Sequence, residues 1–513
     1  MSTPSEISIT EPFLAAAFAK LSPRDRIRIL DDAPKTLWLF GAGASHHYDL
    51  NSWGVPVPLA NGFFEAFQSL PTSRGFNAHV GPFVSYLNHY RGVRPDRVDE
   101  FKENIEAFMT SVERELLEIK EVKEQNEKLS AEEYGKMLSV VMAMNNMTFI
   151  LANVINEAQN GPSPSLYAYL LDFCGPNDAF VTFNWDTLLD RALAATGGWS
   201  PTNGYGLSFS ATLDGSWQRT AMGESGFSTN WKLLKLHGST NWLVPYSVIG
   251  FQTLELTSMV PRSDQIFLYW QSTLPFKTHK SRWRGGYVPT CYGYYPPNIP
   301  AEYFEKSQLA AKPGYSFVQF NLMGVFSPFK EPSADGVPSS PLLITPVKQK
   351  RYEDYAASIE CLWQAAEVEF QQVERIVVIG YSFPETDTKP LQMMRDALST
   401  RSGAVVVHIV APDAQQIAAR IGDDHLKHAK LVSLYPGKFD DYIEFLAQSA
   451  SELMKRAASK SGEVEEWLKR LFVMEAIALS GGLTLPDLYR DESVEGGERL
   501  GGKEIEGSER ENN

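Results

Sequence analysis

The chain has 513 residues, a hydrophobic content of 43% and a formal net charge of −15 at pH 7. This length allows one large domain with insertions or two to three domains, and the hydrophobic content is sufficient for a substantial core. The acidic balance argues against general binding to nucleic-acid backbones, which requires a clustered positive field.

Cysteine usage and the lack of a recognisable targeting signal indicate the cellular compartment in which the protein works. Cys174, Cys291 and Cys361 are dispersed, and they form neither a disulfide framework nor paired zinc ligands. The apolar patch at residues 13–19 follows acidic rather than basic residues, unlike a signal peptide. No uninterrupted apolar run approaches the roughly 20 residues that span a bilayer. We therefore expect a cytoplasmic protein that holds no metal and binds no membrane.

The first part of the chain predicts one strand and a helical insertion. Residues 1–35 are expected to form a helical lead-in, and "TLWLF" (36–40) a short buried strand that ends in a glycine turn. From Phe101 onward apolar residues recur at spacings of three and four, as they do again over 137–155, which is typical of amphipathic helices. Residues 97–160 are thus interpreted as a helical subdomain inserted after the first strand–helix unit.

The rest of the chain alternates between strands and helices. Buried strands are predicted at 179–183, 232–236, 341–346, 375–380 and 404–410, and a helix at 353–371. An aromatic, loop-rich insertion with a small β element is expected over 260–340, C-terminal helices over 446–480 and an acidic disordered tail over 481–513. The alternation predicts an α/β fold with a Rossmann-like, doubly wound parallel sheet.

Small or polar residues follow four of these predicted strands. The segments are "WLFGAGAS" (38–45), "VTFNWD" (181–186), "LKLHGS" (234–239) and "VVIGYSFPETD" (377–387). Taken singly, each has a simpler interpretation, such as a tight turn, a structural histidine or helix capping by Asp186 or Asp387. The carboxyl ends of parallel strands meet at one edge of a sheet, where open α/β sheets bind ligands. We therefore expect the four segments to form one site.

The order of these motifs resembles that of a known family. Gly-Ala-Gly-x-Ser at 41–45, Thr-x-Asn-x-Asp at 182–186 and Leu-His-Gly-Ser at 236–239 are similar to the motifs of the sirtuin fold. The segment "IVVIGYSFPETD", after "ITP" and a Trp-containing helix, resembles the Sir2-type branch found in bacterial antiphage-defence proteins. The resemblance implies that residues 36–445 form a sirtuin-like NAD-binding domain.

The resemblance also implies a role for individual residues. Asn184 would orient the nicotinamide ribose or the attacking water, Asp186 would support the same pocket, and His237 would contact the ribose as general base. The resemblance also implies residues that bind NAD. The pyrophosphate and adjoining ribose would be bound by Gly41, Ala42, Gly43 and Ser45, and the adenosine half by Gly380, Tyr381 and Ser382. Other implied NAD-binding residues are Thr182, Gly238, Ser239 and Asp387.

Departures from the family pattern shape the expected activity. The chain lacks the two cysteine pairs of the zinc module, and Gly54 and Pro56 are not followed by the Asp-Phe-Arg of deacetylases. Water is then the simplest acceptor, which implies an NAD glycohydrolase that depletes cellular NAD during infection. Two alternatives stay open: an NAD-dependent deacylase or ADP-ribosyl transferase, and a non-catalytic NAD-binding sensor or scaffold.

An NAD hydrolase must be kept inactive until it is needed, so partners are expected. A homo-oligomer is predicted from an apolar helical stripe formed by Trp467, Leu468, Leu471, Phe472 and Ile477. A separate activating partner, such as an ATPase or an infection sensor, is the alternative route to control. Residues 277–295 interleave basic and aromatic side chains, but in so acidic a chain we do not expect direct nucleic-acid binding.

Overall fold

The structure is a computed structural model. It describes residues 35–51, 53–70, 80–125, 129–214, 216–220, 231–245, 248–250, 265–270, 299–303, 315–320, 326–329, 339–347, 350, 357–401 and 403–447. The predicted helical lead-in, the segment 277–295, the apolar stripe near residue 470 and the acidic tail lie outside the described residues.

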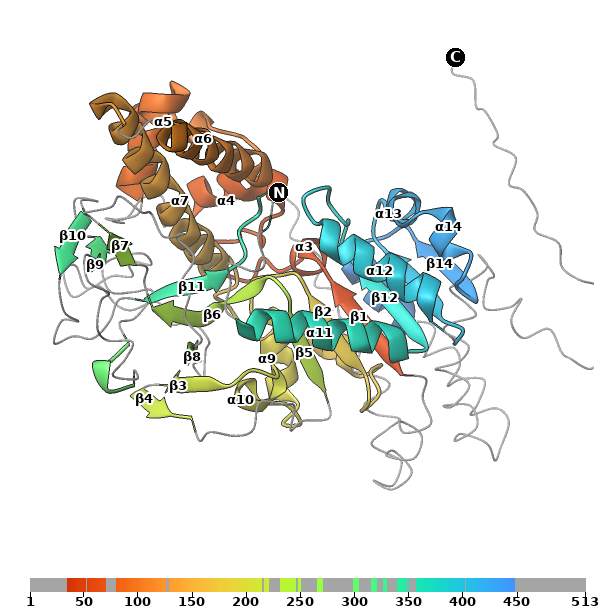
Figure 1. Cartoon of the computed structure of the whole chain (residues 1–513). Coiled ribbons are helices and arrows are strands. Elements are labelled where there is room, and N and C mark those ends of the chain that lie inside the picture. Colours follow the sequence, from red (N-terminus) through yellow and green to blue (C-terminus); the bar gives the residue numbers. More distant parts are fainter. Residues whose placement is uncertain are drawn as a thin grey trace, which may run out of the picture.

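A six-stranded parallel sheet forms the centre of the molecule (Figure 1). Its strands are β1 (Thr36–Phe40), β2 (Ala179–Thr182), β5 (Lys232–Lys235), β12 (Arg375–Ile379), β13 (Val406–Val410) and β14 (Leu431–Tyr435). They lie in the order β14-β13-β12-β1-β2-β5, and every neighbouring pair is parallel. The predicted α/β, Rossmann-like doubly wound fold is confirmed. The direction of winding reverses between β1 and β12, which makes this point the topological switch of the sheet.

Short helices pack on both faces of this sheet. They are α3 (Ala42–Ser45), α8 (Ser165–Leu171), α9 (Leu188–Ala195), α10 (Pro201–Gly204), α11 (Ala357–Gln372), α12 (Thr388–Thr400), α13 (Ala414–Ile421) and α14 (Asp423–Leu426). Figure 1 shows α11 and α12 side by side across the front of the strands. Tyr167 of α8 packs edge-on against Phe40 of β1, with ring centroids 5.7 Å apart. Side chains alternate along a strand, so the neighbouring Leu39 of β1 faces the opposite layer.

A bundle of helices, of which α6 and α7 are the longest, lies at one end of the sheet (Figure 1). They are α4 (Phe63–Ser69), α5 (Val80–Arg91), α6 (Ile105–Gln125) and α7 (Ala131–Ala158), with the short η1 (Ala60–Gly62) and η3 (Pro95–Glu100) between them. The two predicted amphipathic helices are confirmed as α6 and α7, while α4 and α5 were not assigned from the sequence. Phe64, Phe83 and Phe108 form an aromatic cluster that joins α4, α5 and α6.

The helix α7 begins at a capping box and forms the core of this bundle. Ser130 accepts a hydrogen bond from the N–H of Glu133, whose carboxylate accepts one from the N–H of Ser130. By length and composition α7 is the one helix in the described parts of the chain that could cross a bilayer, yet 67% of its most apolar window is buried within the protein.

Two smaller sheets lie beside the bundle. The five-stranded sheet has the order β11-β6-β8-β3-β4, with β3 (Phe209–Asp214), β4 (Ser216–Arg219), β6 (Gly238–Pro245), β8 (Ile266–Tyr269) and β11 (Ser339–Leu343). The three-stranded sheet contains β7 (Val248–Gly250), β9 (Tyr315–Phe320) and β10 (Phe326–Phe329), and η4 (Ala301–Tyr303) precedes β9. The predicted insertion over 260–340 thus contributes strands to both sheets.

One predicted strand pairs in a different sheet from the one expected, and the sequence did not lead to a prediction of β3, β4, β6, β7 or β14. The run at 341–346 was expected in the parallel sheet, but β11 pairs antiparallel with β6. A short apolar run indicates that a strand is buried but not which sheet it joins, so the run is compatible with the parallel sheet and with the five-stranded sheet. The edge strand β14 (LVSLY) was not predicted, and in the structure only Ser433 within it is fully buried.

Candidate functional site

A cavity of about 800 Å³ lies at the carboxyl edge of the parallel sheet. Segments that follow all six strands line it: Ala42 and Gly43 after β1, residues 183–186 after β2, His237 after β5, residues 380–382 after β12, residues 410–413 after β13 and residues 437–440 after β14. This is the location in which open α/β sheets bind ligands, directly over the topological switch. The expectation that four distant segments meet at one edge is confirmed.

The glycine turn after β1 packs against the loop after β12. The N–H of Gly41 donates to the carbonyl of Ile379 at 3.0 Å, and the N–H of Gly43 donates to that of Gly380 at 3.0 Å. A Cβ on Gly41 would lie 2.5 Å from the Cα of Tyr381, and Gly380 adopts a φ of +62°. Both glycines of the turn are therefore explained by the close approach of another backbone. Contact with a pyrophosphate stays a prediction.

This packing makes Gly41→Ala a sensitive test of the turn. The added methyl group meets fixed backbone atoms, so we expect a loss of about 1–3 kcal/mol in the free energy of unfolding, as for other overpacked sites. Gly135→Ala in α7 is the matched control, because nothing lies within 4 Å of its Cβ position. Alanine favours helices, so the control should be neutral or stabilising. Chemical denaturation of both variants checks this, and equal stabilities would contradict the packing argument.

Asn184 ties the glycine turn to the loop after β2. Its Nδ2 donates to the carbonyl of Gly41 at 2.9 Å and to the Oγ of Ser45 at 3.0 Å. A carbonyl oxygen only accepts, so the amide nitrogen must face the turn. No hydrogen bond from a described residue reaches Oδ1, and Asn184 lines the cavity, so this oxygen can accept a hydrogen bond from a ligand. Ser45 lies behind Asn184 and also bonds Tyr167 at 3.0 Å, which makes it a support for the asparagine.

Besides Gly41 and Ser45, three other predicted ligand contacts do not line the cavity. Thr182 accepts a hydrogen bond from the N–H of Asn184 at 3.0 Å. Gly238 opens β6 with a φ of +79°, and a Cβ there would lie 2.1 Å from the carbonyl oxygen of Leu342. Ser239 donates to the carbonyl of Trp185 at 3.4 Å. The structure gives all three a role in positioning the loops that carry Asn184 and His237.

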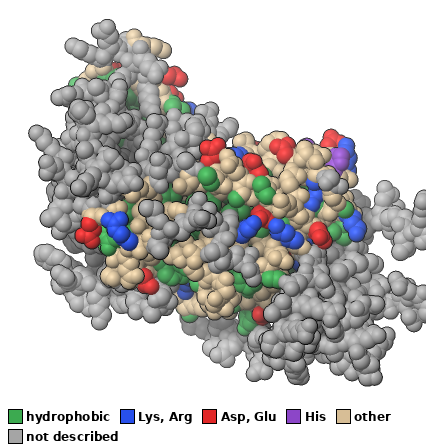
Figure 2. All heavy atoms as spheres, turned by 60° about the horizontal axis from the view of Figure 1, so that its bottom comes forward, with side chains coloured by type: hydrophobic (Ala, Val, Ile, Leu, Met, Phe, Trp, Pro, Cys, Tyr) green, Lys and Arg blue, Asp and Glu red, His purple; other side chains and the backbone are tan. Residues whose placement is uncertain are grey.

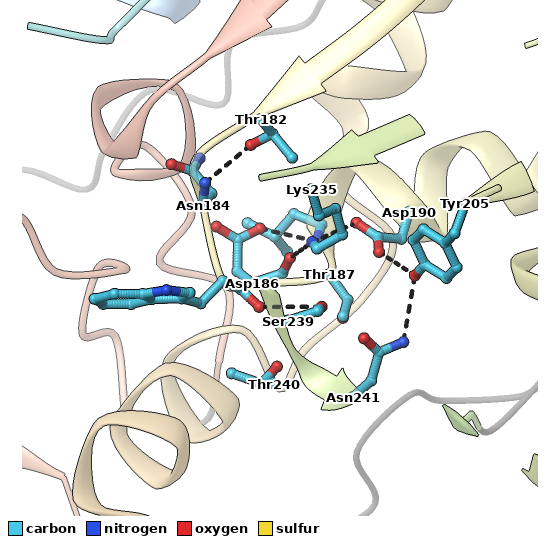
Figure 3. A network of polar contacts seen from close by, with 12 residues as sticks. Thr182, Asn184, Asp186, Thr187, Asp190, Tyr205, Lys235, Ser239, Thr240 and Asn241 are labelled. Carbon is cyan, nitrogen blue, oxygen red and sulfur yellow. Dashed lines mark hydrogen bonds and ion pairs between the residues drawn. The ribbon is translucent and has the colours of Figure 1, made fainter. Parts of the chain in front are cut away.

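A buried ion pair between Lys235 and Asp190 lies next to Asp186 and supports its backbone (Figure 3). Oδ1 of Asp186 accepts the N–H of Leu188, the first residue of α9, at 3.0 Å, although the N-cap position of this helix belongs to Thr187, and its carbonyl accepts from Nζ of Lys235. Nζ also lies 3.2 Å from Oδ2 of Asp190, and both side chains are only 1% exposed. Burial raises the pKa of Asp190, and the nearby Lys235 opposes that rise. The segment that carries Asn184 and Asp186 thus rests on a charged pair inside the core.

Neighbouring polar side chains extend this network. Tyr205 donates to Asp190, and Nδ2 of Asn241 donates to the Tyr205 hydroxyl at 3.3 Å (Figure 3). Gln159 of α7 accepts from the N–H of Thr187 at 2.6 Å and from its hydroxyl at 3.0 Å. Both ends of the Asn184–Thr187 segment are therefore anchored, which limits the movement of side chains over the cavity.

His237 lies at the end of β5 against aromatic rings. Its side chain is in contact with Phe183, with ring centroids 4.9 Å apart, and the residue is 5% exposed. Burial, and then the nearby charge of Lys350, hold the pKa of His237 well below its usual range. The imidazole is therefore neutral near pH 7 and can accept a proton.

Asp387 lies opposite His237. It occupies the N-cap position of α12, but its side chain makes no capping hydrogen bond, so the simpler interpretation as a helix cap was wrong. Its Oδ2 accepts from the Tyr381 hydroxyl at 2.8 Å, and its Oδ1 lies 3.7 Å from Nε2 of His237. Tyr381 stacks on Phe183 at 4.2 Å, which fixes the hydroxyl that holds the carboxylate.

Five charged residues that line the cavity were not predicted, and two of them, Lys350 and Glu106, lie beside Asp387 and its neighbour Thr386. Lys350, which follows β11, contacts Asp387, and burial lowers its pKa to about 8 against the opposing effect of Glu106. Glu106 belongs to α6 and accepts a hydrogen bond from Thr386 at 3.0 Å. The helical insertion therefore contributes to the wall of the cavity. Neither residue lies in a recognisable motif, so no sequence signal pointed to them.

Metal and surface charge give no further site. Among the described residues, no group of three or more His, Cys, Asp or Glu side chains is placed to hold a metal ion. On the face drawn in Figure 2, basic and acidic side chains of the described residues are interspersed rather than segregated. The described residues on this face form no continuous basic surface of the kind that binds nucleic-acid backbones (Figure 2).

Comparisons with known proteins give a distant likeness. No family model and no curated protein matches the chain. Among solved structures it is similar to a Sir2 homologue in complex with NAD, at 13% identity and a TM-score of 0.29, over 84% of this chain and 95% of that one. A mutant Sir2 homologue in complex with 2'-O-acetyl ADP-ribose matches at 12% identity and a TM-score of 0.32, over 86% of this chain and 100% of that one. Such low scores define no corresponding residues.

Proposed function

We propose that the protein is an NAD glycohydrolase that splits NAD into nicotinamide and ADP-ribose. The observation that carries this proposal is the meeting of Asn184 and a neutral, buried His237 on one cavity at the switch point of a Rossmann-like sheet. A dinucleotide is the ligand class that such a crevice accommodates, and the resemblance of the strand-end motifs to those of sirtuins points to NAD.

The chemistry requires one polar stabiliser and one base. As the bond between nicotinamide and ribose breaks, its electron pair leaves with the pyridine nitrogen, and positive charge develops on the sugar. Oδ1 of Asn184 would orient the attacking water or the ribose. His237 would accept the proton that water loses as its oxygen bonds to the anomeric carbon. Closely packed glycines at positions 41, 43 and 380 hold the loops that place these groups.

The expected pH dependence follows from the environment of His237. Because burial and Lys350 hold the pKa of His237 well below 6.5, the base stays neutral at moderately acidic pH. We expect the acid limb of kcat/KM for NAD to lie below pH 6.5. Lys350→Met removes the nearby cation, so the pKa of His237 should rise and the acid limb should move to higher pH. An acid limb that moves to lower pH in this variant would contradict the arrangement.

We also propose a role in antiphage defence through depletion of NAD in the cytoplasm. The support is the resemblance of "IVVIGYSFPETD" to the defence branch, together with the toxicity of an unregulated NAD hydrolase. Control would come from assembly into a homo-oligomer or from a separate activating partner such as an ATPase or infection sensor.

Assembly has a direct test. If oligomer formation activates the enzyme, specific activity should rise with protein concentration in parallel with the molar mass measured by light scattering. Replacing Trp467 and Leu471 by Ser should lower both quantities together. A strict monomer with constant specific activity would leave control to a separate partner.

Product analysis separates the proposed activity from its alternatives. The full chain is incubated with NAD, with and without an acetylated peptide, and the products are identified by chromatography and mass spectrometry. Nicotinamide and ADP-ribose without peptide support hydrolysis, whereas a cyclic product indicates cyclisation. O-acetyl-ADP-ribose or modified peptide indicates a deacylase or transferase. Binding of NAD without turnover would indicate a sensor or scaffold.

A further inference from the structure

The carboxylate of Asp387 is buried, fixed and free of a helix-capping role. The residue is 4% exposed and lines the cavity beside His237. Two neighbours hold it in one orientation: the Tyr381 hydroxyl donates to Oδ2 at 2.8 Å, and Nζ of Lys350 forms an ion pair with Oδ1. A buried carboxylate that makes no capping hydrogen bond and stands among catalytic candidates calls for a role within the site.

The imidazole of His237 has an unsatisfied nitrogen that faces this carboxylate. Nε2 is buried and has no hydrogen-bond partner among the described residues, and Oδ1 of Asp387 has no partner among them besides its ion pair with Lys350, which leaves it a lone pair to accept an N–H. The two atoms are 3.7 Å apart, so a small rotation of the ring brings them to hydrogen-bond distance. A neutral imidazole carries one N–H, and an N–H directed at a carboxylate satisfies both atoms.

We propose that Asp387 is the positioning residue for His237, which it holds in the tautomer with the proton on Nε2. Nδ1 then keeps its lone pair, and no described residue occupies that nitrogen. A carboxylate that fixes the tautomer and orientation of a histidine base is an established device in hydrolases of other folds. Tyr381 and Lys350 hold the carboxylate in turn, so the base is supported from β12, α12 and the segment after β11.

The role of Nδ1 as the base rests on the proposed function, whereas the tautomer does not. In the tautomer with the proton on Nε2, a water molecule at Nδ1 would lose its proton to that nitrogen while its oxygen attacks the anomeric carbon. The competing role for Asp387 is direct binding of a ribose hydroxyl. That role would affect the binding of NAD without requiring a particular tautomer of His237.

The tautomer is measurable without NAD. In the full chain labelled with ¹⁵N-histidine, the ring signals of His237 are assigned by their loss in His237→Gln. We expect the wild type to show the proton on Nε2, and Asp387→Asn, whose amide can donate to Nε2, to shift the population toward the proton on Nδ1. A wild type with the proton on Nδ1, or a variant with an unchanged tautomer, overturns the proposal.

Kinetics then separate positioning from binding. Asp387→Asn should lower kcat by about 10²–10⁴-fold with little change in KM. Asp396→Asn removes an exposed carboxylate from the same helix and should leave both constants unchanged. A raised KM with normal kcat would assign Asp387 to ribose binding and overturn the positioning role. If the wild type does not turn over NAD, the proposed function fails, while the NMR result still decides the tautomer.

Discussion

Replacing either Asn184 or His237 by alanine should lower NAD turnover by about 10²–10⁴-fold. His237→Ala removes the imidazole proposed to accept the proton, and Asn184→Ala removes the oxygen proposed to orient water or the ribose. Turnover is measured from nicotinamide release by the full chain at saturating NAD. Circular dichroism and thermal melting of each variant show whether the fold is retained.

Asn184 needs a second variant because its amide nitrogen also has a structural role. Asn184→Ala loses two hydrogen bonds, to Gly41 and to Ser45, so part of its effect can arise from a displaced glycine turn. Ser45→Ala removes one of these bonds and leaves the amide oxygen in place. We expect Ser45→Ala to retain most of the activity. A loss in Ser45→Ala as large as that in Asn184→Ala would assign the effect to the turn rather than to the oxygen.

The largest expected effect on stability comes from Lys235→Met. Lys235 and Asp190 are 3.2 Å apart and both are 1% exposed, so removal of the lysine leaves an unpaired charge in the core. Breaking a buried pair in this way typically costs about 3–5 kcal/mol of the free energy of unfolding. The variant also loses the hydrogen bond to the carbonyl of Asp186, which holds the segment carrying Asn184. Urea denaturation followed by tryptophan fluorescence measures the change.

Two further variants identify the cause of this loss. The double variant Lys235→Met with Asp190→Asn removes both charges, so it should be more stable than Lys235→Met alone. Lys427→Met breaks an exposed pair with Asp424, whose side chains are 60% and 93% exposed, and it should leave the denaturation midpoint unchanged. Equal losses in Lys235→Met and Lys427→Met would contradict the account of the buried pair.

Much of the fold was predictable because the parallel strands are continuous apolar runs. The runs at β1, β2, β5, β12 and β13 are buried on both faces, so their sequences carry a clear signal. The edge strand β14 is an apolar run interrupted by Ser433 and is only partly buried, so its signal is weaker. The run at β11 was assigned to the wrong sheet because its pattern specifies burial but not a partner.

The site was predictable only where it lies next to a strand end. Asn184, His237 and Tyr381 follow parallel strands directly, so the topology places them on the cavity. Lys350 and Glu106 come from an aperiodic segment and from the helical insertion, and they reach the cavity through tertiary packing alone.

The sequence motifs also could not distinguish residues that line the cavity from residues that hold the lining residues in place. Ser45 and Thr182 belong to the same short motifs as the lining residues, yet they lie behind Asn184 and hold it. A motif indicates that its residues belong to the same part of the site. Whether each of them lines the cavity depends on the direction in which its side chain points, which the motif does not specify.

The most direct measurement is a time course of NAD turnover by the wild type and His237→Asn, followed side by side by proton NMR without any peptide. We expect the wild type to release nicotinamide and ADP-ribose in equal amounts as NAD disappears. The folded His237→Asn variant should be slower by about 10²-fold or more. Equal rates in the two proteins, or no turnover by either the monomeric or the assembled wild type, would contradict a glycohydrolase site built around His237.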